Sequence, residues 1–116
     1  MTSELLDLNA INELKEMLED DFLELFVVFK DNSRKNIDNL KTACEQYNIE
    51  DMFKYAHILK GSCGNLGLTC IFNLMSDLEE KLKKDDKANV NALMLELETI
   101  YVATISELVK NNFLET

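Results

Sequence analysis

Turn-forming residues are scarce in this sequence. It contains no proline, and its three glycines, Gly61, Gly64 and Gly67, lie within one stretch of seven residues. Tight β-hairpins depend on Asn-Gly, Asp-Gly or Gly-X pairs, so the composition disfavours an all-β sandwich or barrel. The glycine-rich phosphate-binding sequences of Rossmann folds and P-loops are also missing. These absences favour a chain of long, uninterrupted helices.

Apolar residues recur every three or four positions along most of the chain, which is the spacing of one helix face. They predict a short first helix at about residues 9–18, followed by four longer ones. The four apolar stripes run from Phe22 to Tyr47, from Met52 to Leu66, from Ile71 to Leu82 and from Val90 to Leu108. We therefore expect an all-α fold, an antiparallel up-down four-helix bundle with a short additional N-terminal helix closing one end.

The ends of two helices carry their own signals. Asn48 stands three residues before Asp51, the spacing of a capping box, and is expected to begin the third helix. Gly67 is placed to end that helix in the left-handed conformation, and Thr69 is expected to cap the next one. With 116 residues the chain predicts a single domain, 1–116, whose core bundle covers about residues 20–113.

Net charge restricts the partners of this protein. The chain has 12 basic and 22 acidic residues, and the resulting charge of −10 opposes binding to nucleic acid and to anionic lipid. No apolar run approaches the length of a membrane span, and the acidic N-terminus is unlike a signal peptide.

The three cysteines, Cys44, Cys63 and Cys70, form no CxxC pair and are expected to be small buried hydrophobes. We therefore expect a cytoplasmic protein.

The most informative segment surrounds His57, the only histidine of the chain. Gly61 and Gly64 fall inside the third helix, where each costs about 1 kcal/mol relative to alanine. At about 100° per residue, His57 lies about 160° from the inward Leu59, while both glycines lie within about 40° of His57. Lys60 stands about 60° to the other side. The spacing predicts an exposed imidazole, an ammonium beside it and bare backbone that another protein could approach.

The residues around His57 suggest a positively charged docking site. No carboxylate occurs between Met52 and Ser76, so we expect a locally positive surface that attracts a phosphoryl group or an acidic pocket. Nothing acidic lies three or four residues from His57, which leaves a neutral imidazole nitrogen available as a nucleophile near pH 7. Phe53 lies on the same helix face and Ile58 at its margin, where they could supply apolar contacts to a partner.

The string H-I-L-K-G-S-C-G-N-L-G, residues 57–67, resembles the signature H-x-L-K-G-S-x-x-x-L-G of the histidine-containing phosphotransfer (HPt) family. Helix number and order are similar along about residues 10–112. The resemblance implies that His57 is phosphorylated, that Lys60 steadies the phosphoryl charge, and that Gly61 and Gly64 give the partner room. It also implies a monomeric carrier, not itself an enzyme, without cofactor or metal of its own. Its partners would be receiver domains of response regulators, which supply Mg²⁺, and a hybrid sensor histidine kinase.

Other interpretations remain open at this point. A helical adaptor could bind receiver domains without being phosphorylated, and a dimerising kinase-type phosphotransfer domain would need an adjoining ATP-binding domain. Gly61 could serve close helix packing, and Phe53 could pack against the first or second helix. A di-iron bundle is disfavoured, because Lys54 stands where a Glu-x-x-His motif needs glutamate and no second histidine exists.

Overall fold

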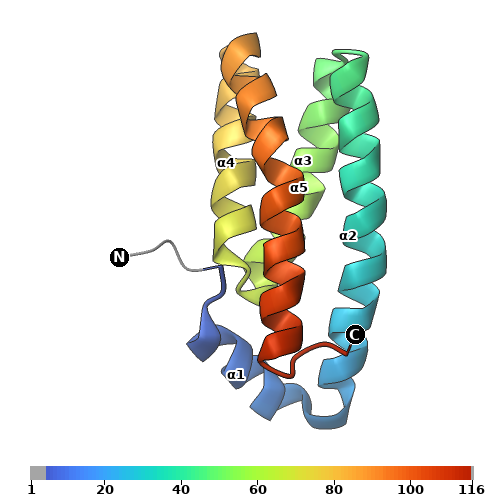
Figure 1. Ribbon diagram of the computed structural model, residues 1–116, viewed down its shortest axis with the longest axis vertical. Helices are drawn as coiled ribbons and strands as arrows, with labels where there is room; N and C mark the ends of the chain where they lie inside the picture. Colours follow the sequence, from blue (N-terminus) through green and yellow to red (C-terminus); the bar gives the residue numbers. More distant parts are fainter. Residues whose placement is uncertain (1–4, 116) are drawn as a thin grey trace.

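The computed structural model describes residues 5–115 and confirms the all-α fold (Figure 1). The elements are α1 (Leu8–Leu18), a 3₁₀ turn η1 (Glu19–Asp21), α2 (Phe22–Glu45), α3 (Ile49–Leu66), α4 (Thr69–Lys83) and α5 (Lys87–Lys110). Helices α2 to α5 run alternately up and down as an antiparallel bundle, and α1 lies across one end of it. No helix within residues 5–115 is both long enough and apolar enough to cross a membrane.

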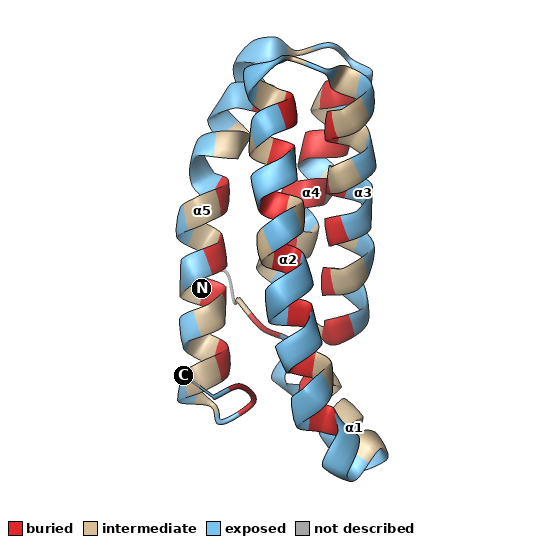
Figure 2. Ribbon diagram, turned by 90° about the vertical axis from the view of Figure 1, so that its right-hand side faces the viewer, coloured by how far each residue is buried: buried red, intermediate tan, exposed pale blue. Residues whose placement is uncertain are grey.

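The core lies along the axis of the bundle, where each helix presents one buried stripe (Figure 2). Large side chains that are fully buried come from every helix of the bundle and include Phe26, Leu40, Leu59, Met75 and Leu97. Burying apolar area of this kind is the dominant stabilising contribution to such a fold. The predicted stripes therefore account for the packing of the bundle.

Polar side chains also connect α2 to α5. The hydroxyl groups of Ser33 and Tyr101 lie 2.7 Å apart within the bundle. Arg34 donates two hydrogen bonds of 2.9 Å to the carboxylate of Glu98, and the Lys41 ammonium pairs with the same carboxylate. The hydrogen bonds from Arg34 and then from Lys41 lower the pKa of Glu98 to about 2.

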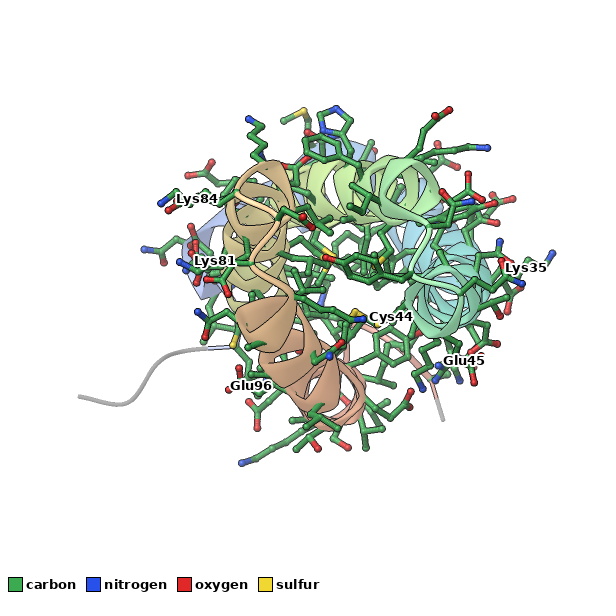
Figure 3. All side chains as sticks on the ribbon, turned by 90° about the horizontal axis from the view of Figure 1, so that it is seen from above. Lys35, Cys44, Glu45, Lys81, Lys84 and Glu96 are labelled. Carbon is green, nitrogen blue, oxygen red and sulfur yellow. The ribbon has the colours of Figure 1, made fainter. Side chains whose placement is uncertain are left out.

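The turn after α2 differs from the prediction. Helix α2 ends at Glu45, so Tyr47 lies beyond it with φ at 47°, and its hydroxyl donates a 2.7 Å hydrogen bond to Asp85. Ala43 takes the buried position in the last turn, and Cys44 is only half-buried. Cys44 and Tyr47 still pack against the core as partly buried residues. Seen along the bundle axis, Lys35, Lys81 and Lys84 point outward (Figure 3).

Two further sequence predictions need correction. Thr69 does not cap α4 but is its first residue, and Leu68 occupies the cap position without a side-chain hydrogen bond. The side chain of Leu68 is fully buried. This residue packs into the core just before the first turn of α4. Of the three cysteines, all of which are free thiols, only Cys63 is buried, while Cys44 and Cys70 are half-buried.

Asn48 begins α3 and Gly67 ends it, as the sequence predicts, but the capping box is incomplete because the backbone N–H of Asn48 bonds the carbonyl of Ala43 and not the Asp51 side chain. The Asn48 side chain accepts a 3.1 Å hydrogen bond from the backbone N–H of Asp51. Gly67 has φ at 76°, in the left-handed region, and the N–H of Leu68 bonds the carbonyl of Cys63 at 2.9 Å. The Gly67 carbonyl also accepts a 2.8 Å hydrogen bond from the N–H of Asp7. The end of α3 thereby holds the beginning of α1 close to the His57 segment.

Candidate functional site

His57 projects outward from the middle of α3, and 71% of its side chain is exposed. The opposite face of the helix carries the stripe from Met52 to Leu66, and every member of that stripe is buried. Burial of this stripe fixes the rotation of α3 about its axis. As the spacing predicts, that rotation places the imidazole on the surface.

A carboxylate from the neighbouring helix contacts the imidazole directly. Oε2 of Glu79, in α4, lies 2.9 Å from Nδ1 of His57, and its Oε1 accepts a 2.8 Å hydrogen bond from the Lys60 ammonium. Only 9% of the Glu79 side chain is exposed. The prediction of a carboxylate-free, locally positive surface around His57 is therefore wrong. The acid comes from α4, which no spacing within α3 can reveal.

The charge of Glu79 determines which imidazole nitrogen carries hydrogen. Burial opposes its ionisation, but the hydrogen bonds from Lys60 and His57 outweigh burial and lower the pKa of Glu79 below its ordinary 4.5. At neutral pH the group is thus a carboxylate, which can only accept hydrogen bonds. Nδ1 of His57 must therefore be the donor. In the neutral ring this leaves Nε2 with the lone pair, as a nucleophile requires.

The position of Glu79 in the sequence offers a signal for this contact. It stands four residues after Met75 and three before Leu82, so it lies at a position of the buried α4 stripe. Carboxylates are almost never fully buried unless they are paired. A glutamate on an otherwise apolar stripe therefore indicates a partner on the adjacent helix, although it does not say which one.

Lys60 lies beside His57 but is engaged in two contacts. Besides its ion pair with Glu79, its ammonium lies 5.9 Å from the centre of the Phe72 ring, in α4. About 31% of the Lys60 side chain is exposed. The positive charge thus faces the same surface as the imidazole, and Glu79 holds it in place.

The three glycines of α3 have different surroundings. A Cβ atom at Gly61 would meet nothing within 4 Å, so this glycine faces open space and serves no close packing. A Cβ atom at Gly64 would lie 2.9 Å from Cδ1 of Phe72, so the ring occupies that side of the helix. At Gly67 a Cβ atom would add a 3.2 Å contact with Ile11 to the left-handed φ. Only Gly61 presents uncovered backbone next to the imidazole.

The two apolar residues proposed for docking differ in exposure. Ile58 is 41% exposed, on the surface beside His57. Phe53 is half-buried, packs against the core, and has the Lys83 ammonium 5.7 Å from its ring centre. Phe53 therefore combines a packing role with a partly exposed edge.

A groove of about 470 Å³ adjoins His57 on the side of Gly61 and Gly64. Helices α3 and α4 form two of its walls, and the beginning of α1 forms the third. Its lining includes His57, Lys60, Gly61, Gly64, Phe72, Leu68, Asp7 and Ala10. No group of three or more His, Cys, Asp or Glu side chains in residues 5–115 is arranged to hold a metal ion.

Residues 24–109 match the family model of the Hpt domain. The chain belongs to the Hpt domain family. The matched range contains α3 with His57 and α4 with Glu79, while the part of the groove formed by Asp7 and Ala10 lies outside it. This Hpt domain therefore has a histidine phosphotransfer role in a phosphorelay. Hpt proteins are carriers in such relays, not catalysts, and they interact with receiver domains and kinases.

A solved structure has the same fold as this Hpt domain. The crystal structure of histidine-containing phosphotransfer protein B (HptB) from Pseudomonas aeruginosa PAO1 superposes with a TM-score of 0.87 and 22% sequence identity. The match covers 97% of this chain and 96% of the HptB chain. It includes the short helix α1 as well as the bundle. A comparison with curated proteins gives no match.

Proposed function

We propose that this Hpt domain accepts a phosphoryl group on Nε2 of His57 from the aspartyl phosphate of one receiver domain and passes it to another. The observation that carries this proposal is the exposed imidazole whose Nδ1–H is bound by the Glu79 carboxylate. That contact leaves Nε2 as the nitrogen with a free lone pair. The only histidine of the chain thus combines access with the required tautomer.

The proposed step balances as a displacement at phosphorus. The Nε2 lone pair forms the N–P bond while the bond from phosphorus to the receiver aspartate breaks, and that aspartate leaves as a carboxylate. The imidazole ring gains positive charge, which the hydrogen bond from Nδ1 to Glu79 stabilises. Transfer to the next receiver reverses these changes. The chain binds and orients the group, and the receiver supplies Mg²⁺ and the remaining charge stabilisation.

Lys60 is proposed to steady the phosphoryl oxygens. Its ammonium has three N–H donors, of which one bonds Glu79 in the structure. The other donors remain for an anionic group on the neighbouring His57. Gly61 supports the same step because its uncovered backbone lets the receiver approach the imidazole closely.

The partners follow from this chemistry. We propose receiver domains of response regulators and a hybrid sensor histidine kinase as donors and acceptors, and we propose that the protein acts as a cytoplasmic monomer. The net charge of −10 disfavours nucleic acid as a partner. Measuring the mass in solution tests the monomer.

Label transfer tests the proposed function. Wild type and His57→Gln are incubated with a panel of phosphorylated receiver domains, and we expect acid-labile, alkali-stable label on the wild type alone. Because His57 is exposed, the variant should fold normally, which thermal unfolding checks. Equal labelling of His57→Gln would show that His57 is not the acceptor. Binding of receivers without any labelling would instead support the adaptor.

A further inference from the structure

Phe72 of α4 lies against the part of α3 that has no side chain. An added Cβ atom at Gly64 would come within 2.9 Å of Cδ1 and 3.0 Å of Cε1 of the ring. The ring therefore sits directly on the Gly64 backbone, which no other residue type would allow without displacing it. Phe72 is nevertheless only half-buried, so part of the ring faces outward. Gly64 thus seats an aromatic side chain at the edge of the site.

The Phe72 ring forms part of the floor of the groove beside His57. The groove's other walls include the uncovered backbone of Gly61, the Leu68 segment, and Asp7 and Ala10 at the beginning of α1. The charged side chains of the lining are both engaged: the Lys60 ammonium donates a 2.8 Å hydrogen bond to Glu79, and the Asp7 carboxylate accepts a 3.1 Å hydrogen bond from the backbone N–H of Ala10. Burying a further charge in such a groove would be costly, whereas an apolar group would lose only its contact with water. The groove therefore suits an uncharged, apolar side chain.

The position of the groove determines what must cover it during transfer. The reacting atoms of a phosphoryl donor have to come within about 3–3.5 Å of His57. A protein that docks for this step covers far more than one side chain, typically about 800 Å² on each partner. Because His57 itself lines the groove, the surface of the donor or acceptor must extend over it.

We propose that the groove floored by Phe72 receives an apolar side chain from the receiver domain that exchanges phosphoryl groups with His57. The proposal rests on the function proposed above and adds a recognition contact to it. Gly64 then acts through Phe72, by seating the ring, and not by direct contact with the receiver. Phe72 is a binding residue that does not touch the reacting atoms.

The test uses the receiver domain to which the wild-type protein transfers label fastest. We expect Phe72→Ala to raise the Kd for that receiver about tenfold, as truncation of a buried aromatic anchor does, and to change the transfer rate at saturating receiver less than about threefold. Val102→Ala is the matched control. It removes an apolar side chain that is 54% exposed on α5, and it should leave both quantities unchanged.

Gly64→Ala provides the second arm, because its methyl group would displace the ring without truncating it. We expect a weaker Kd from this variant, and no further weakening when it is combined with Phe72→Ala. Thermal unfolding establishes that each variant is folded. An unchanged Kd in both folded single variants would overturn the proposal, and so would additive effects in the double variant. If no receiver labels the wild type, the proposed function itself has failed.

Discussion

Replacing Glu79 by leucine separates stability from phosphotransfer. The residue occupies a position on the α4 stripe between Met75 and Leu82, where an apolar side chain of similar size would fit the core. Its two hydrogen-bond partners, Lys60 and His57, are 31% and 71% exposed and can regain water when the carboxylate is removed. Replacing a buried ion pair by an apolar residue is often neutral or stabilising. We expect the free energy of unfolding of Glu79→Leu to stay within about 1 kcal/mol of wild type, or to rise.

The same substitution should slow transfer to and from His57. Without the carboxylate, nothing holds hydrogen on Nδ1 or stabilises the positive charge that the ring gains as the N–P bond forms. A hydrogen bond to a charged group contributes about 1.5–3 kcal/mol, which corresponds to a transfer rate about 10- to 100-fold lower. Glu79→Gln keeps a carbonyl acceptor for Nδ1–H but loses the charge. Its rate should therefore lie between those of wild type and Glu79→Leu.

Three measurements decide this prediction. Urea unfolding gives the stability of both variants, single-turnover transfer from a phosphorylated receiver gives the rates, and ¹⁵N NMR of the imidazole reports the tautomer. We expect the wild type to show the Nδ1–H form and Glu79→Leu to show a mixture of both. Wild-type transfer rates in Glu79→Leu would refute the argument. A large loss of stability with an unchanged tautomer would show that Glu79 serves the bundle instead.

Three further predictions concern single residues. Gly67→Ala should lower the free energy of unfolding by about 1–2 kcal/mol, because φ is 76° and the new Cβ crowds Ile11; an unchanged thermal midpoint would contradict this. Gly61→Gln should fold normally, since its side chain enters open space, yet slow receiver transfer; a wild-type rate would remove its proposed role. The fold lowers the pKa of Glu98 from 4.5 to about 2, so its ion pairs stabilise the protein above pH 4.5 and this contribution is lost as the pH falls toward 2. With 41% of that side chain exposed, Glu98→Gln should cost at most about 1 kcal/mol at pH 7, and its melting midpoint should converge with wild type near pH 2.

The spacing of apolar residues along the chain was enough to predict the helices and the rotation of each about its own axis. Burial follows the spacing of apolar residues, so the stripe from Met52 to Leu66 sufficed to turn His57 and Gly61 toward solvent. The left-handed end of α3 was also readable, because Gly67 is the residue that adopts positive φ without strain. These features depend on residues close together in the chain, where helix geometry alone relates one position to the next.

The residues that α4 contributes to the site became visible only in the packed bundle. Glu79 lies 22 residues after His57, and Phe72 follows Gly64 through the turn between the helices. Whether such residues meet depends on the register and tilt of α4 against α3, which arise from packing two complete helix faces together. Spacing within one helix contains no information about that register. The imidazole was therefore predictable from α3 alone, whereas its hydrogen-bond partner and the aromatic floor beside it were not.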